Sequence, residues 1–451
     1  MTRLCFYKGL DTIGGTVVEI QTEDARCIFD FGLDGASELD RRIRPRPATM
    51  VRDYALAGCL PMVGGLYDRA ELGNIPLASY AETEIKPFVC ISHMHIDHMG
   101  TLGFLAKEVE VFMSEESLCL YRGLANTRDI LFRPHENVTG LAPMAWVKKG
   151  NIALRMIPVD HDVPGACGFE IVTPDGRICY TGDLRLHGFC GKDTLAFASA
   201  VHGADVCITE GVTVSFIEDF DGVAPDSGLD AAITENQVLE DIAIAAANTK
   251  GLVFLNLYNR NIQKLAQLHK SLKKVGRQLV LEPETAHLLN CFFPERQLYV
   301  YEPLCHGAPN AQRIAVSREA VQDHPGRYVL QLSYAHLLET LDYESASSLY
   351  IHSNGVPLGA YDPSYQRLFD FLLRQGIPYL SIGCGGHASP AHLKYILEAI
   401  APKCLVPLHS LTPEKIHIKG ALQVLPEANQ WYFLQSGALT LCGGGPLSPL
   451  V

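Results

Sequence analysis

The stretch ISHMHIDHMG at residues 91–100 carries three histidines and one aspartate within six positions. The apolar PFVCIS before it predicts a buried strand, and TLGFLAKEVE after it predicts a short helix over residues 101–110. The polar side chains therefore stand on a loop between two elements: His93, His95, Asp97 and His98. Clustered imidazoles and a carboxylate resist burial unless a cation holds them, and both groups are zinc ligands. We predict a metal site here, the alternative being a polar loop that happens to be rich in histidine.

The H-x-H-x-D-H arrangement resembles the signature of the metallo-β-lactamase fold, whose members bind one or two metal ions between two β-sheets. This resemblance implies an αββα sandwich and further ligands downstream in a set order. His161 follows the apolar MIPV, Asp183 follows the apolar ICY, and His409 lies at the end of the predicted strand CLVPL. Asp30 follows CIF, where the resemblance implies a carboxylate that orients a ligand by a hydrogen bond. The alternative for Asp30 is a turn cap at the end of a strand.

The resemblance also implies how two metal ions are shared among these residues. One ion takes His93, His95 and His161, the other takes Asp97, His98 and His409, and Asp183 bridges the two. Asp97 is in addition a candidate to orient the nucleophile or accept its proton. We expect two zinc ions per chain, although histidine and aspartate also serve manganese.

From about residue 225 the pattern changes to alternating helices and strands, which predicts a parallel α/β sheet. We predict an inserted domain at 213–376, with the two parts of the sandwich at 1–212 and 377–451. The segment from Gly251 to Glu282 is similar to the β-CASP domain of ribonucleases J. By this similarity Arg260 would bind a nucleic-acid phosphate, the alternative being a surface charge at the start of a helix.

The GGHAS motif at 385–389 resembles the ribonuclease J motif in which Gly, His, Ala and Ser follow one another. The glycines, Gly386 among them, would let the backbone approach a ligand closely, and the N–H groups of the helix beginning near residue 390 would form a phosphate pocket. Within the motif Ala388 is a candidate substrate contact, and His387 would donate a hydrogen bond to the scissile phosphate or assist the leaving oxygen. Ser389 would either bind a phosphate or cap the following helix. Glu210, at the end of the predicted strand DVCITE, resembles an acidic motif of β-CASP nucleases, the alternative being a polar strand end.

Composition sets outer limits on these predictions. The chain of 451 residues is 47% hydrophobic and 19% charged, as expected for a globular protein of two domains or one domain with an insertion. No apolar run approaches the roughly 20 residues that span a bilayer, and the N-terminus lacks the features of a signal peptide. The 14 cysteines form no C-x-x-C pair and are expected to be reduced. We therefore expect a cytoplasmic protein without membrane association.

The net charge of −13 argues mildly against a broad nucleic-acid surface. The count omits bound metal, however, and two divalent ions would add about four positive charges where a phosphate must bind. The most basic stretch, RRIRPRPATMVR at 41–52, holds five arginines and reads either as a phosphate-contacting arm or as a structural loop.

These features together predict a metal-dependent phosphodiesterase that cleaves single-stranded RNA as an endonuclease, a 5′-exonuclease or both, with a water activated by two metals. A DNA nuclease of the same group is one alternative, and a hydrolase of small esters or thioesters on the same metal core is another. A third is a nucleic-acid-binding scaffold with a vestigial site. We expect no counterpart of the longer C-terminal domain of typical ribonucleases J, and whether the chain forms a homo-oligomer stays open.

Overall fold

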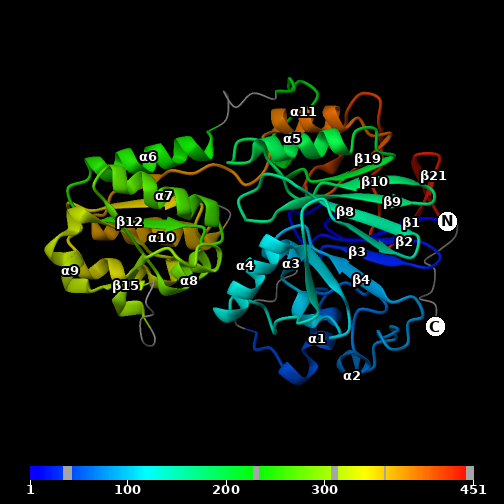
Figure 1. Ribbon diagram of the computed structural model, residues 1–451, viewed down its shortest axis with the longest axis horizontal. Coiled ribbons are helices and arrows are strands. Elements are labelled where there is room, and N and C mark those ends of the chain that lie inside the picture. The colour runs from blue at the N-terminus through cyan, green and yellow to red at the C-terminus, as the bar shows by residue number, and fades with distance from the viewer. Residues whose placement is uncertain (34–42, 227–232, 306–312, 360–361, 443–451) are drawn as a thin grey trace.

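Two β-sheets stack face to face in the larger of two lobes of the computed structural model, which describes residues 1–33, 43–226, 233–305, 313–359 and 362–442 (Figure 1). The first sheet has the order β22-β21-β1-β2-β3-β4-β5-β6. Its strands are β1 (Arg3–Lys8), β2 (Val17–Gln21), β3 (Arg26–Phe29), β4 (Pro87–Cys90), β5 (Val111–Ser114), β6 (Val138–Leu141), β21 (Trp431–Gln435) and β22 (Ala438–Leu441). Strand β21 lies beside β1, and β22 pairs with β21, so the two ends of the described chain meet in one sheet.

The second sheet has the order β20-β19-β11-β10-β9-β8-β7. Its strands are β7 (Trp146–Lys149), β8 (Ile152–Pro158), β9 (Cys167–Thr173), β10 (Gly176–Tyr180), β11 (Val206–Thr209), β19 (Cys404–Pro407) and β20 (Leu422–Gln423). Alternate residues of the strands point between the sheets, as Ile152, Leu154 and Met156 of β8 do. The core between the sheets contains aromatic rings, with Phe169 stacked on Tyr180 and edge-on to Phe29.

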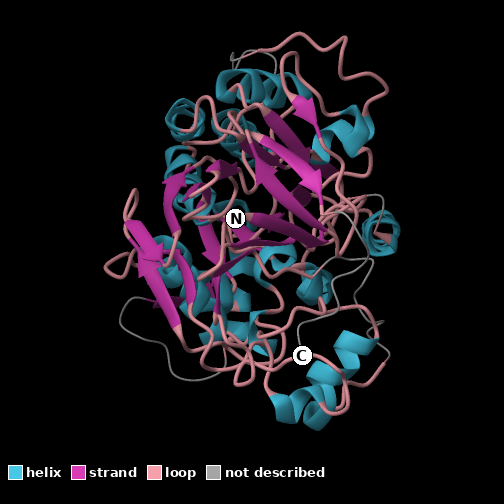
Figure 2. Cartoon of the chain, turned by 90° about the vertical axis from the view of Figure 1, so that its right-hand side faces the viewer, coloured by secondary structure: helices cyan, strands magenta, loops and turns pink. Residues whose placement is uncertain are grey.

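Helices cover the outer faces of both sheets (Figure 2). On the first sheet lie α1 (Met50–Leu56), α2 (Arg69–Leu72), α3 (Ile96–Met99) and α4 (Glu115–Asn126). On the second lie α5 (Gly191–Ala200) and α11 (Pro390–Ile400), which share one apolar cluster. This confirms the predicted αββα sandwich.

The predicted helix over residues 101–110 is wrong. Helix α3 begins inside the histidine motif at Ile96, and only a 3₁₀ turn, Leu102–Phe104, follows it. Because Leu102, Phe104 and Leu105 are all buried, this segment has no solvent-facing side and packs as a compact turn into the core. A run of apolar residues that is buried on every side lacks the periodicity of a surface helix.

The smaller lobe is built on a third sheet with the order β15-β14-β13-β16-β12-β17-β18, in which every neighbouring pair is parallel. Its strands are β12 (Val253–Leu257), β13 (Gln278–Leu281), β14 (Leu298–Tyr301), β15 (Arg313–Val316), β16 (Tyr328–Gln331), β17 (Leu349–Ser353) and β18 (Tyr379–Ser381). Its helices are α6 (Glu235–Asn248), α7 (Ile262–Lys274), α8 (Pro283–Phe292), α9 (Arg318–Asp323) and α10 (Pro363–Gln375). The predicted parallel α/β arrangement is confirmed.

The contacts of the connecting segments lead us to propose that the insertion begins and ends later than the predicted range of 213–376. Thr213 donates a hydrogen bond to the carbonyl of Ala388 at 2.7 Å, and Lys394 donates to the carbonyl of Val223 at 2.8 Å, so residues 213–226 pack on the larger lobe. Strand β18 pairs with β17 beyond residue 376. An alternation of helices and strands does not reveal on which lobe a connecting segment packs. We therefore propose 233–381 as the inserted unit.

The two lobes meet where α4 lies against α8. A Cβ atom at Gly123 of α4 would come within 3.0 Å of Leu288 and 3.3 Å of Cys291 on α8, so a glycine lets these helices approach closely. Among the helices that the structure describes, none is long and apolar enough to span a membrane.

The aromatic contacts between the sheets lead to a prediction about stability. Phe169→Ala removes a fully buried ring that contacts Phe29 and Tyr180, and we expect it to lower the free energy of unfolding by about 3–5 kcal/mol. Phe216→Ala, at a side chain that is 71% exposed, is the control and should change it by less than about 0.5 kcal/mol. Urea unfolding followed by circular dichroism measures both, and equal values would contradict this account of the core.

Candidate metal centre

Seven polar side chains meet at one edge of the sandwich, each on a segment that follows a strand. The segments after β4, β8, β10 and β19 supply them, so parts of the chain more than 300 residues apart come together. They form two overlapping groups, each with its potential ligand atoms within 4.8 Å of one another: His93, His95, His161 and Asp183, and Asp97, His98, Asp183 and His409. The structure therefore brings together all seven residues that the sequence marked as ligands.

Close backbone packing holds the histidine motif in place. Phe31 donates a backbone hydrogen bond to the carbonyl of His98 at 2.8 Å, and Leu33 donates to the carbonyl of Ile96 at 3.2 Å. A Cβ atom at Gly32 would overlap the carbonyl oxygen of Asp97 at 1.7 Å. Only glycine permits the segment after β3 to approach the motif this closely.

Buried polar atoms in the cluster lack hydrogen-bond partners among the described residues. These atoms are Nε2 of His93, Nε2 of His98 and Oδ2 of Asp183, and all three side chains are at most 1% exposed. Asp183 Oδ2 lies 3.3 Å from His98 Nε2 and 3.6 Å from His93 Nε2. Unsatisfied buried polar atoms are costly, and a cation between them would satisfy both imidazole nitrogens and the carboxylate at once. The residues present therefore fit a metal ion.

Neighbouring groups occupy the opposite nitrogen of several rings and so orient them. His98 Nδ1 lies 2.7 Å from Asp30 Oδ2, and His93 Nδ1 lies 2.9 Å from Ser92 Oγ. His161 Nδ1 donates to the carbonyl of Gly386 at 2.6 Å. In all three rings Nε2 is left to face the cluster, as is usual for histidines that bind metals.

Asp30 lies fully buried behind the cluster. Besides His98, it accepts hydrogen bonds from the backbone and hydroxyl of Ser92, at 2.7 and 2.8 Å, and from the Tyr180 hydroxyl at 2.6 Å. One carboxylate thus ties β10 and the end of β4 to a histidine of the motif. This position is the one that the sequence indicated for a carboxylate that orients a ligand.

The electrostatics of the cluster favour a positive charge near Asp183. Burial lowers the pKa of His161 to about 3, so this ring is neutral and able to bind a metal. For His409 burial acts in the same direction, but the carboxylates of Asp183 and Asp97 outweigh it and raise the pKa to about 10. A proton on His409 supplies positive charge between the two carboxylates, where a bound cation would also supply it.

His387 and Glu210 form a pair beside the cluster. His387 Nδ1 lies 3.3 Å from Glu210 Oε2 and 3.7 Å from Asp183 Oδ2, while Glu210 also accepts the backbone N–H groups of Leu184 and Val212. Burial lowers the pKa of His387, but Glu210 and Asp183 more than offset it and raise the pKa above its ordinary value. The sequence marked both residues, but separately. Their pairing depends on where the chain returns from the insertion to the sandwich.

The rest of the GGHAS motif is packed against the cluster. Ala388 is buried and donates its backbone N–H to the carbonyl of Leu184 at 2.7 Å. The Ser389 hydroxyl accepts the backbone N–H of His392 at 3.3 Å, so it caps α11, one of the two roles left open by the sequence.

Burial of Arg260 shows that the alternative of a surface charge is wrong, whereas its role as a phosphate ligand stays a prediction. Its side chain is buried, donating to the carbonyl of Met94 at 2.8 Å and to Asp129 at 2.9 Å. The neighbouring Tyr258 ring lies edge-on to His95, with centroids 5.4 Å apart. Since Nη1 and Nη2 both donate within the protein, we propose that Arg260 fastens the insertion to the histidine motif.

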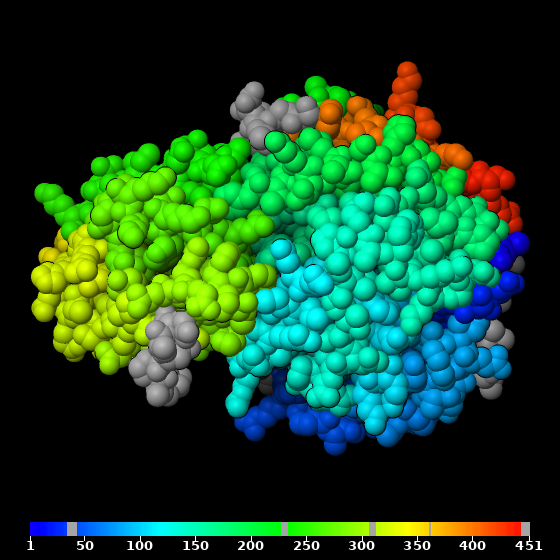
Figure 3. All heavy atoms as spheres, in the orientation of Figure 1, coloured from blue at the N-terminus to red at the C-terminus, as the bar shows by residue number. Residues whose placement is uncertain are grey.

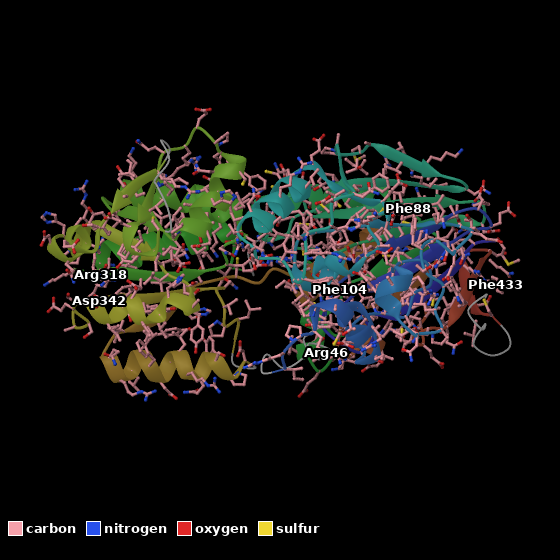
Figure 4. The ribbon with its side chains drawn as sticks, turned by 90° about the horizontal axis from the view of Figure 1, so that it is seen from below. Arg46, Phe88, Phe104, Arg318, Asp342 and Phe433 are labelled. Carbon is pink, nitrogen blue, oxygen red and sulfur yellow. The ribbon has the colours of Figure 1, made fainter. Side chains whose placement is uncertain are left out.

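The arginine-rich stretch is only partly described, because Arg41 and Arg42 lie outside the described residues. Arg46 lies at the surface of the larger lobe, on the side towards the smaller one (Figure 4). It binds Asp53 at 2.6 Å, and Arg52 binds the same carboxylate at 3.1 Å. Arg46 in particular lowers the pKa of Asp53 to about 2. These ion pairs neutralise part of the charge of the stretch.

Arg185, which the sequence did not mark, connects three parts of the chain. It is 1% exposed and donates to Glu235 Oε1 of α6 at 3.1 Å, to the carbonyl of Gly385 at 2.9 Å and to the carbonyl of His161 at 3.3 Å. Its Nε lies 3.5 Å from Asp160 Oδ2. One guanidinium thus joins the sandwich, the first helix of the insertion and the segment that carries His387.

A cavity of about 300 Å³ opens beside His161. It lies between the N-terminus of α4 and the ends of β8 and β9, with Gln263 of the insertion in its wall, and Figure 3 shows the surface hollowed where the lobes meet. Glu115, Glu116 and Asp193 line it, whereas no lysine or arginine does among the described residues. The cavity is therefore acidic.

Comparison with known proteins agrees with this fold. Residues 76–219 match the β-lactamase superfamily domain. Ribonuclease J of Mycoplasma genitalium is 20% identical over 90% of this chain and 68% of its own length, and that of Thermus thermophilus is 23% identical over 74% and 60%. Ribonuclease J 1 of Streptococcus pyogenes is 22% identical over 96% of this chain and 73% of its own. The chain thus spans about two thirds of the length of these relatives.

A solved structure covers almost the whole chain. The crystal structure of a protein of unknown function from Enterococcus faecalis V583 has a TM-score of 0.82 and 29% sequence identity, and covers 95% of this chain and 99% of that one. The chain therefore has the metallo-β-lactamase fold, and its resemblance to the β-CASP ribonucleases J is confirmed.

The contacts of Arg185 lead to a second prediction. Arg185→Met leaves Asp160 and Glu235 buried without their counter-charge, and we expect it to lower the free energy of unfolding by about 3–5 kcal/mol. Arg374→Met, at an exposed position on α10, is the matched control and should change it by less than about 0.5 kcal/mol. Urea unfolding at fixed protein concentration measures both. If the two variants are equally stable, Arg185 does not hold the lobes together.

Proposed function

We propose that this chain is a metal-dependent phosphodiesterase that cleaves single-stranded RNA with an activated water. The observation that carries the proposal is the convergence of seven potential ligands with the His387–Glu210 pair at one site, where the inserted lobe meets the sandwich. The similarity to ribonucleases J supports RNA as the substrate. Both endonuclease and 5′-exonuclease action are compatible with such a site.

In this proposal the two groups of ligands hold two divalent ions. One ion would be held by His93, His95 and His161, the other by Asp97, His98 and His409, with Asp183 between them. Zinc suits the imidazole-rich set, and manganese is the alternative. When bound, the ions would supply a water that ionises near neutral pH and positive charge for the phosphate.

The residues of the chain would then position the reactants and move protons. Asp97 Oδ2 lies 3.1 Å from His409 Nε2, and its side chain is 29% exposed, so it reaches the mouth of the site and can orient the attacking water. His387 is 22% exposed, and Glu210 and Asp183 favour its protonated form. A protonated His387 can donate to a phosphate oxygen or to the departing oxygen.

Hydrolysis of a small ester or thioester is the second candidate function. The cavity beside His161 favours it, because it holds about 300 Å³ and its described lining carries acidic side chains but no lysine or arginine. A polyanion would be repelled there, whereas a small uncharged substrate would not. The GGHAS motif and the inserted lobe favour the nuclease, since a small substrate needs neither.

Nuclease activity is tested with 5′-labelled single-stranded RNA and protein loaded with zinc or manganese. His387→Ala should slow cleavage by about 10²–10⁴-fold while leaving bound metal in place, because it removes a proton donor but none of the seven proposed ligands. His202→Ala, an exposed histidine remote from the cluster, should cleave like the unaltered protein. The size of the first product separates 5′-exonuclease from endonuclease action. If the loaded protein cleaves no RNA and no DNA but hydrolyses a thioester reporter, the second candidate function replaces the first.

The metal count is a separate prediction. Elemental analysis after zinc loading and gel filtration should give two ions per chain. His409→Ala removes a proposed ligand of the second ion and none of the first, so it should give one. Exhaustive chelation should lower the melting temperature, because buried ligands are left without a counter-charge. Fewer than one ion per chain in the unaltered protein would contradict the proposed chemistry and favour a non-enzymatic scaffold.

A further inference from the structure

One carboxylate at the metal centre belongs neither to the predicted ligands nor to the groups already described. Asp162 follows His161 directly, and its Oδ1 lies 3.0 Å from His95 Nε2 and 3.5 Å from His161 Nε2. The side chain is 15% exposed, and Oδ1 is buried with no hydrogen-bond partner among the described residues other than these ring nitrogens. A buried negative charge is costly unless it is paired, so this carboxylate needs a partner that compensates its charge.

The orientation of the His95 ring shows what the carboxylate can do. His161 Nδ1 is bonded to the carbonyl of Gly386, so its Nε2 faces the cluster, and this Nε2 lies 3.2 Å from His95 Nδ1. His95 therefore presents Nδ1 to the cluster and turns Nε2 towards Asp162. His93 and His98 are turned the opposite way, with Nδ1 held from behind and Nε2 facing inwards.

A neutral imidazole carries its proton on either nitrogen, and only the unprotonated nitrogen can bind a metal. A carboxylate beside Nε2 favours the proton there and leaves the lone pair of Nδ1 free for an ion. Carboxylates commonly orient metal-binding histidines in this way, and losing one typically weakens metal affinity by about 10–100-fold.

We propose that Asp162 is a positioning residue that accepts a hydrogen bond from His95 Nε2 and so makes Nδ1 the ligand atom for the first metal ion. The inference rests on the metal site proposed above, but it does not depend on the substrate. Asp162 would then orient the His95 ring, as Asp30 orients the His98 ring.

Gly386 confines the carboxylate to this position. A Cβ atom there would lie 3.2 Å from Asp162 Cγ, 3.2 Å from Asp162 Oδ2 and 3.2 Å from His161 Cε1, so the backbone of the GGHAS motif packs directly on both residues. The same backbone accepts the His161 hydrogen bond. The segment that returns from the insertion thus covers the carboxylate. The position of the smaller lobe on the sandwich therefore affects the orientation of His95.

The test measures metal binding and ring protonation rather than catalysis. Titration against a chromophoric chelator should show zinc affinity of one site about 10–100-fold weaker in Asp162→Ala, with the other site unchanged and two ions still bound at saturation. Asp162→Asn keeps an oxygen that can accept from Nε2–H and should recover most of the affinity. Asp193→Ala, which removes an exposed carboxylate from the adjacent cavity, is the matched control and should bind zinc like the unaltered protein.

Two spectroscopic measurements separate this role from direct ligation. Long-range ¹H–¹⁵N spectra of zinc-loaded protein labelled at histidine, with His95 assigned from its loss in His95→Gln, should show the His95 proton on Nε2. The visible absorption of cobalt-substituted protein should keep its band intensities in Asp162→Ala, because no ligand is lost. A His95 proton on Nδ1, an altered cobalt coordination number or unchanged zinc affinity would each overturn the proposal. A protein that passes these tests yet cleaves no RNA would refute the proposed function alone.

Discussion

The carboxylate of Asp183 is the constraint on which the site depends. It is 1% exposed and is faced by Nε2 atoms of His93 and His98 and by Nδ1 of His409. A buried carboxylate is stable only with compensating positive charge, which in the proposed enzyme a pair of cations would supply. The sandwich supplies the rigidity: Asp30 and Ser92 hold the rings of the motif from behind, so the ligand atoms face one another before any ion arrives.

The inserted lobe is part of the site. Arg260 reaches from the insertion to the carbonyl of Met94 inside the histidine motif, and Arg185 reaches from the sandwich to Glu235 on α6. Both guanidiniums are buried, and each donates to at least one carbonyl oxygen as well as to a carboxylate. Shifting the smaller lobe would break these contacts and move His387 relative to Asp183. The geometry of the site thus depends on how the two lobes pack against each other.

Much of the fold could be predicted because its signals are local or ordered along the chain. The histidine motif is contiguous, each of the later candidate ligands follows an apolar strand, and alternating helices and strands indicated the parallel sheet of the insertion. What could not be predicted depends on contacts between distant segments. Arg260 reads as a surface charge or phosphate ligand until the lobes are packed together, and the pairing of Glu210 with His387 joins residues on either side of the insertion. The role of Asp162 could not be predicted, because an aspartate next to a histidine in the sequence does not indicate which ring nitrogen its carboxylate will face.

The most direct test of the central claim is anomalous diffraction at the zinc absorption edge from crystals grown with zinc. The account predicts two strong peaks, one among His93, His95 and His161 and one among Asp97, His98 and His409, with Asp183 in contact with both. Absence of anomalous signal at the cluster, or zinc bound with His409 turned away, would contradict it.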